Sequence, residues 1–225
     1  MSLRFLTCGE SHGKGYLIIL EGMPCGLAIS KELIEQDLTR RRRGYGRGER
    51  MKLEKDEFEY FGGVRGGLTT GNPIGVVLRN SEWEKWRGAM DPFKVDKEEA
   101  AQKAVTRPRP GHADFAGMAK FGFEEARNVL ERASARATAA WTVAGAICKT
   151  FLIELGITVR SAVTSIGTEI VDLPESDEEW AEAYSSDMGV AGHNMEARLR
   201  RAIDEAGQSG DSLGGTFAVV VKNVP

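Results

Sequence analysis

One segment limits the choice of fold more than any other. Residues 133–155, ASARATAAWTVAGAICKTFLIEL, form a helix-length run that is rich in alanine and apolar on nearly every side. A helix exposed to water keeps a polar side, whereas a helix that is apolar nearly all round is buried on several sides. The rest of the chain must therefore supply elements that surround this helix, and 225 residues are enough to build such a core.

The other elements mix strand and helix patterns in irregular order. Strands are predicted at 2–8, 15–22, 74–79, 158–167 and in the final TFAVVVKNVP (216–225). Helices are predicted after Ser30, after Asp96, over SDEEWAEAY (176–184) and over NMEARLRRAIDEAG (194–207). Hairpin-like strand pairs beside a long central helix favour an α+β fold in which antiparallel β-sheets sandwich helices.

Composition excludes several classes of protein. The net charge of −3 and the pI near 5.8 give no general attraction to nucleic acid or to an anionic membrane. No apolar run reaches the ~18–20 residues that span a bilayer, and the N-terminus enters a strand pattern without a removable leader. The cysteines, Cys8, Cys25 and Cys148, are odd in number and far apart, which favours reduced thiols in a cytoplasmic protein. No histidine or carboxylate pair has the spacing of metal ligands.

We expect residues 1–225 to be the N-terminal part of a single domain without an internal linker or repeat. The chain stops at Pro225 directly after a predicted strand. That ending indicates that a longer protein has been cut here.

The stretch GESHG (9–13) fits the Gly-x-Ser-x-Gly pattern of a nucleophile elbow in esterases and lipases. An elbow needs a helix directly after the turn, whose N-terminus helps to stabilise the oxyanion. Here KGYLIILEGMP follows, which is a strand pattern, and a triad would also need an acid followed by a histidine downstream. We therefore interpret Ser11 as a hydrogen-bond donor in a tight loop and disfavour the hydrolase.

Three stretches set arginines among glycine, proline or small residues: RRRRGYGRG (40–48), TRPRPGHAD (106–114) and LERASAR (130–136). Arginine holds phosphate or carboxylate with a planar fork, and a rigid loop presents that fork to a small anionic ligand. Two alternatives stay open at this point. The first run is also typical of the solvated end of a helix, and its Arg-Gly-Tyr character is typical of some RNA-binding segments.

Two of the three histidines, His12 and His112, lie in glycine-flanked loops near these arginines. Histidine transfers protons near neutral pH, and arginines beside it could hold an anionic substrate. The third, His193, is predicted at a helix start on the surface.

Together, GESHGKG…LEGMP (9–24), RRRRGYGRGERM (40–51), TTGNPIGV (69–76), RPRPGHAD (107–114), RNVLERASARAT (127–138) and GDSLGG…VVVKNVP (210–225) resemble chorismate synthase. The resemblance implies a lyase that converts 5-enolpyruvylshikimate 3-phosphate to chorismate and phosphate with reduced FMN. It also implies an α+β sandwich, a homotetramer, and NADPH as a reductant in some members.

The resemblance assigns roles residue by residue. His112 is expected to act as a general acid on the departing phosphate, and His12 to protonate or hydrogen-bond the flavin. Substrate binding is assigned to Ser11, Arg41, Arg47, Arg109, Ser134 and Arg136. Contacts to FMN or NADPH are assigned to Arg41, Arg47, Ser134, Ala135 and Arg136.

Family members continue well beyond Pro225, with an Arg-x-Asp motif and much of the FMN site in the missing part. The resemblance therefore implies that 225 residues alone are inactive or nearly so. The alternatives are a fragment that binds the phosphorylated substrate without turnover and, last, an RNA-binding protein that uses residues 40–48.

Overall fold

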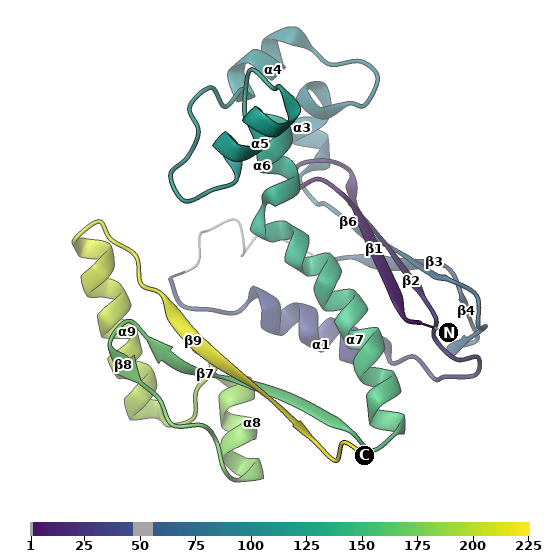
Figure 1. The fold of residues 1–225 in the computed structure, drawn as a ribbon, viewed down its shortest axis with the longest axis vertical. Coiled ribbons are helices and arrows are strands. Elements are labelled where there is room, and N and C mark those ends of the chain that lie inside the picture. The colour runs from purple at the N-terminus through teal and green to yellow at the C-terminus, as the bar shows by residue number, and fades with distance from the viewer. Residues whose placement is uncertain (1, 47–55) are drawn as a thin grey trace. The chain divides into compact units, whose positions relative to one another are not determined.

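The computed structural model describes residues 2–46 and 56–225 (Figure 1). The strands are β1 (Arg4–Gly9), β2 (Gly15–Glu21), β3 (Phe58–Gly62), β4 (Val64–Arg65), β5 (Leu68–Thr69), β6 (Ile74–Arg79), β7 (Thr158–Ile166), β8 (Glu169–Ile170) and β9 (Gly215–Lys222). The helices are α1 (Lys31–Arg42), α3 (Trp83–Met90), α4 (Lys97–Lys103), α5 (Asp114–Phe121), α6 (Arg127–Ala133), the 3₁₀ turn η1 (Ala135–Ala137), α7 (Thr138–Glu154), α8 (Asp177–Ser185) and α9 (His193–Gln208).

The chain divides into two compact units. The first holds Met1–Ser30 with Leu53–Gly145, and the second holds Lys31–Lys52 with Ala146–Pro225. Helix α7 runs from one unit into the other. That the whole chain is one domain stays a prediction.

The first unit is built on a four-stranded sheet with the order β1-β2-β6-β3, antiparallel throughout. Every second residue of β2 and β6 is buried, and Ile18 of β2 pairs with Val76 of β6. This alternation is the period of a sheet with one face on the core. The strands predicted at 2–8, 15–22 and 74–79 are therefore confirmed.

Four short helices, α3 to α6, gather at one end of this sheet (Figure 1). Helix α4 begins after Asp96 as predicted, because the Asp96 carboxylate accepts hydrogen bonds from the backbone N–H groups of Glu98 and Glu99. Helix α3 was not predicted from the sequence. Its first residue follows Glu82, which makes no side-chain capping bond.

The helix predicted over 133–155 is interrupted at its start. Ser134 has an extended backbone (φ −62°, ψ 144°), and its hydroxyl accepts from the N–H of Arg136, 3.2 Å away. Helix α6 therefore ends at Ala133, and α7 begins at Thr138 after the turn η1. Burial of α7 is broad but incomplete, since Val143 and Ile147 are fully buried whereas Trp141 is 63% exposed.

The second unit contains the antiparallel sheet β8-β7-β9 with helices α1, α8 and α9. The prediction of a capped helix at 176–184 is confirmed, because Ser176 and Glu179 form a reciprocal capping box at the start of α8. Leu199 of α9 is fully buried with Val171, Met188 and Val190. His193 lies at the helix start, as predicted.

These observations confirm the α+β class with antiparallel sheets. Among the described residues, no helix combines the length and apolar character that a bilayer crossing requires. No group of three or more metal-ligating side chains occurs within residues 2–46 and 56–225.

Candidate active site

The loop between β1 and β2 carries Ser11 and His12, and two glycines bring its ends together. Gly9 has φ 125°, and a Cβ there would lie 2.3 Å from the carbonyl oxygen of Gly15. Gly15 has φ 152°, and its Cβ would lie 2.1 Å from the carbonyl oxygen of Leu78. Because glycine has no Cβ, the backbone at Gly9 can lie close to Gly15, and the backbone at Gly15 can lie close to Leu78. The loop leads into strand β2 and lacks the helix that an elbow requires, which agrees with the interpretation of Ser11.

Asn80, directly after β6, fixes the shape of this loop. Its Nδ2 donates toward three loop carbonyl oxygens, those of Glu10 (2.9 Å), Ser11 (3.2 Å) and Gly13 (2.8 Å). Its backbone N–H donates to the carbonyl oxygen of Lys14, 3.1 Å away. One residue therefore holds the loop backbone on both sides of His12.

His12 is held by a buried carboxylate from α6. The Nδ1 atom of His12 lies 2.8 Å from Glu131 Oε1, and its backbone N–H donates to Glu131 Oε2 at 2.7 Å. Arg127, one turn earlier on α6, donates to the same Oε1 at 3.1 Å. Ser11 is fully buried, its Oγ lies 3.1 Å from His12 Nδ1, and its N–H donates to the Glu131 carbonyl oxygen.

Burial alone would raise the pKa of the fully buried Glu131 carboxyl. The hydrogen bonds and charge of His12, together with a hydrogen bond from Arg127, outweigh burial, so the pKa of Glu131 is lowered overall. Glu131 is therefore an ionised carboxylate at neutral pH.

An aromatic ring covers the His12 imidazole. The ring centroids of His12 and Trp86 are 3.9 Å apart, with 34° between the ring planes. Two cationic groups also lie over the Trp86 ring, Lys103 Nζ at 4.6 Å and Arg127 Cζ at 5.1 Å from its centroid. Trp86 belongs to α3, so this contact could not be anticipated without that helix.

The second histidine is held in the same way. His112 Nδ1 forms a very short contact with Asp114 Oδ1, and Arg109 Nη2 lies 3.0 Å from the same nitrogen. Arg109 donates to Asp114 Oδ2 from Nε at 2.9 Å and from its backbone N–H at 3.1 Å. The Asp114 side chain is fully buried, whereas those of Arg109 and His112 are 47% and 25% exposed.

Charge couples the two clusters. The hydrogen bond from Arg109 is the main reason that the pKa of Asp114 falls far below its usual range, even though burial opposes the fall. The pKa of Arg109 is raised, first by its hydrogen bond to Asp114 and further by the charges of Asp114 and Glu131. The Glu131 carboxylate, which binds His12, therefore also raises the pKa of Arg109.

The segment 134–136 lies beside the same loop. Arg136 is 4% exposed and forms an ion pair with the buried Asp56. Its Nε donates to Asn80 Oδ1 at 3.2 Å, so Asn80 joins Arg136 to the His12 loop. Ser134 is half-buried and Ala135 is exposed. The ligand-binding roles of these three residues stay predictions, with the guanidinium of Arg136 engaged by Asp56.

The structure does not test the first arginine run as part of this site. Arg41 is half-buried in the last turn of α1, in the second unit. Arg47 lies outside the described residues. Their roles toward substrate or NADPH stay predictions.

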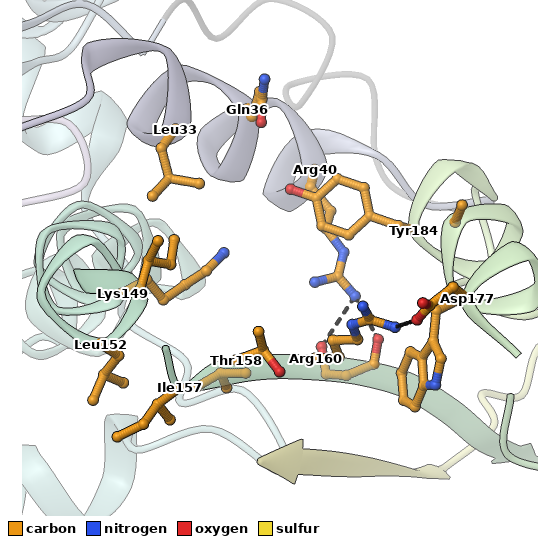
Figure 2. A pocket seen from close by; sticks show the side chains of 15 residues that line it. Leu33, Gln36, Arg40, Lys149, Leu152, Ile157, Thr158, Arg160, Asp177 and Tyr184 are labelled. Atoms are coloured by element: carbon orange, nitrogen blue, oxygen red, sulfur yellow. Dashed lines mark hydrogen bonds and ion pairs between the residues drawn. The ribbon is translucent and has the colours of Figure 1, made fainter. Parts of the chain in front are cut away.

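A cavity of about 470 Å³ is lined by residues of the His12 loop, among them Glu10, together with Trp83 and Arg132. Another of about 460 Å³ lies in the second unit and is shown in Figure 2. Its cations are engaged: Arg40 donates to Ser161, and Arg160 pairs with Asp177 at 2.6 Å. None of the predicted site residues within the described ranges lines this second cavity.

Comparison with known proteins decides the family. The family model described as chorismate synthase matches residues 3–225. The chain belongs to the chorismate synthase family. The chorismate synthase of Carboxydothermus hydrogenoformans is 46% identical over 224 residues, and that of Leifsonia xyli subsp. xyli is 47% identical over 232 residues. A solved structure titled "Crystal Structure of Chorismate Synthase" is 38% identical, with a TM-score of 0.78.

The chain spans only part of the length of these chorismate synthases. The two relatives are matched over 99% of this chain but over only 58% and 57% of their own length, and the solved chain over 60%. By the family-length protein we mean a protein that contains these 225 residues within a chain as long as those of these relatives.

Sequence reasoning missed Glu131, Asp114, Asn80 and Trp86. Two of them stand inside quoted motifs, Glu131 in LERASAR and Asp114 in RPRPGHAD, so attention to acids beside the arginines would have found them. The partners of Asn80 and Trp86 are distant in sequence, and no local signal marks them.

Proposed function

We propose that the family-length protein is a lyase that converts 5-enolpyruvylshikimate 3-phosphate to chorismate and phosphate. The reaction removes a proton from C6 and phosphate from C3, and it leaves a second ring double bond. Family membership supports this activity. The observation that carries the proposal is the pairing of two histidines with arginines and buried carboxylates in one compact unit.

The proposed roles follow from charge and exposure. The substrate carries one phosphate and two carboxylates, and Arg109 is a half-exposed guanidinium beside His112. Asp114 holds Nδ1 of His112, so Nε2 is the nitrogen that would donate a proton to the leaving phosphate. His12 is proposed to act on the flavin, with Ser11 as a hydrogen-bonding neighbour.

The residues described here do not by themselves fit FMN. Of the three predicted contacts at 134–136, the one cationic group belongs to Arg136, which is buried against Asp56. We therefore propose flavin binding for the family-length protein and not for the 225 residues alone. Use of NADPH, a homotetramer and a cytoplasmic location likewise stay proposals.

An anaerobic assay with reduced FMN tests the activity. The family-length protein is expected to form chorismate from 5-enolpyruvylshikimate 3-phosphate, and the 225-residue chain to form little or none. Failure of the family-length protein to form chorismate with saturating reduced FMN would overturn the proposal.

A second candidate is binding without turnover by the 225 residues. It is favoured by the half-exposed Arg109, which is present without the C-terminal part. Calorimetric titration with the same substrate is expected to show heat of binding that Arg109→Ala weakens about ten-fold or more, since a charge-assisted contact is lost. Equal binding by the variant would remove this candidate.

A further inference from the structure

We propose that Asp114 and Glu131 are positioning residues, which fix the tautomer and orientation of His112 and His12 so that each imidazole presents Nε2. The catalytic meaning of this arrangement rests on the proposed function. The arrangement itself can be measured without substrate or cofactor.

The neighbours of His112 determine where its proton lies. Asp114 is ionised, and an ionised carboxylate only accepts hydrogen bonds. Its Oδ1 touches His112 Nδ1, and a lone pair on that nitrogen would face the negative charge directly. Arg109 Nη2 lies 3.0 Å from the same nitrogen. It also lies 3.3 Å from Asp114 Oδ1, which can accept its hydrogen bond in place of Nδ1. We infer that Nδ1 carries the hydrogen and donates it to Asp114.

The contact between His12 and Glu131 uses both carboxylate oxygens. Oε1 lies 2.8 Å from Nδ1 of the ring, and Oε2 accepts from the backbone N–H of His12 at 2.7 Å. A carboxylate fixed to both the ring and the backbone of one residue limits rotation of that ring. Arg127 Nη1 donates to Oε1 at 3.1 Å and holds the carboxylate in place. Ser11 Oγ lies 3.1 Å from the same nitrogen, but Glu131 Oε1 is closer at 2.8 Å and an ionised carboxylate can only accept. The same reasoning therefore places the hydrogen of His12 on Nδ1.

The two sites share a plan that packing alone does not require. In each, a side chain with 0% exposure binds Nδ1 of a partly exposed histidine and is itself bound by an arginine. Orientation of an imidazole by a carboxylate at Nδ1 is how enzymes prepare Nε2 for proton transfer.

Long-range proton–nitrogen NMR of the 225-residue chain shows which ring nitrogen of each histidine carries the hydrogen. The chain has three histidines, so His12→Gln and His112→Gln variants assign every imidazole. At a pH where the rings are neutral, His12 and His112 are expected to carry hydrogen on Nδ1, with a lone pair on Nε2. His193, at the exposed start of α9, serves as an internal reference. Hydrogen on Nε2 of either His12 or His112 would overturn the proposal for that residue.

Variants then test the cause. Asp114→Ala is expected to move His112 toward the Nε2–H tautomer and to leave His12 unchanged, and Glu131→Ala to do the reverse. Asp96→Ala is the matched control, because it removes an aspartate at a helix N-terminus that touches neither imidazole. An unchanged His112 tautomer in folded Asp114→Ala would contradict the proposal. If a variant does not fold, the wild-type spectra still decide between the two tautomers.

The outcome is independent of turnover. If both histidines are Nδ1–H tautomers but the family-length protein forms no chorismate, the proposed function is contradicted and this inference is supported. Chorismate formation with Nε2–H tautomers would do the opposite.

Discussion

At the scale of single residues, the site depends on carboxylates that water does not reach. Asp114 and Glu131 are fully buried, and arginine and histidine donors satisfy their oxygens. Burial without those donors would favour the neutral acid. The donors therefore keep both groups charged.

Asp114 makes stability depend on pH. Arg109 lowers the pKa of this carboxyl in the folded state, so the stabilising contribution is complete above the unfolded pKa of about 4 and is lost as the pH falls below it. Asp114→Asn is expected to lower the free energy of unfolding at pH 7, with a smaller deficit at pH 3. Urea unfolding at the two pH values measures this. An equal deficit at both, with Asp96→Asn as the control, would contradict it.

The stacked pair of His12 and Trp86 offers a fluorescence test. The two ring centroids lie 3.9 Å apart, so removing the imidazole changes the surroundings of the indole. His12→Gln is expected to change the emission intensity of the folded chain at pH 7, and Trp86→Phe is expected to abolish that change. An equal effect of His12→Gln in the Trp86→Phe background would contradict this contact.

At the scale of elements, the contact between α5 and α6 sets the spacing of the two carboxylates. Asp114 is the first residue of α5, and Glu131 lies on α6. Between the helices, a Cβ on Gly117 would lie 2.4 Å and 2.6 Å from the two methyl carbons of Val129. Glycine at 117 therefore allows the helices to approach closely.

Gly117→Ala is expected to destabilise the chain by about 1–3 kcal/mol, because an added methyl overpacks this contact. Val129→Ala in the Gly117→Ala background makes room for that methyl and should recover part of the loss. Gly145→Ala is the matched control, since it also lies in a helix and a Cβ there meets nothing within 4 Å. Chemical denaturation of the four proteins measures the effect. Equal destabilisation at 117 and 145 would contradict the argument.

Elements with local signals were predictable from the sequence, and those that depend on tertiary contacts were not. The capping box of Ser176 and Glu179 marks α8, and alternation marks β2 and β6. The break at Ser134 was missed because apolar periodicity continues across it, and α3 because no side chain caps it.

At the scale of the whole molecule, the sequence identified the family and the two histidines but not what holds them. His12 and Glu131 are 119 residues apart, and Arg136 and Asp56 are 80 apart. Neither the periodicity nor the spacing of residues in the sequence indicates contacts between residues this far apart. Arg136 illustrates the consequence, since nothing in its motif indicates the ion pair with Asp56 that the fold forms, and its ligand contact stays a prediction.

The chain matches relatives over about 58% of their length. Among residues 134–136, which are predicted to contact FMN, the one cationic side chain is buried against Asp56. We therefore place the proposed role of His112, as the acid that protonates the departing phosphate, in the family-length protein.

The role of His112 is measured by the rate of chorismate formation by the family-length protein, with reduced FMN under anaerobic conditions. His112→Ala is expected to lower kcat by about 10²–10⁴-fold, the usual contribution of a general acid, while His193→Ala leaves it unchanged. A His112→Ala protein that turns over as fast as the His193→Ala control would contradict the account.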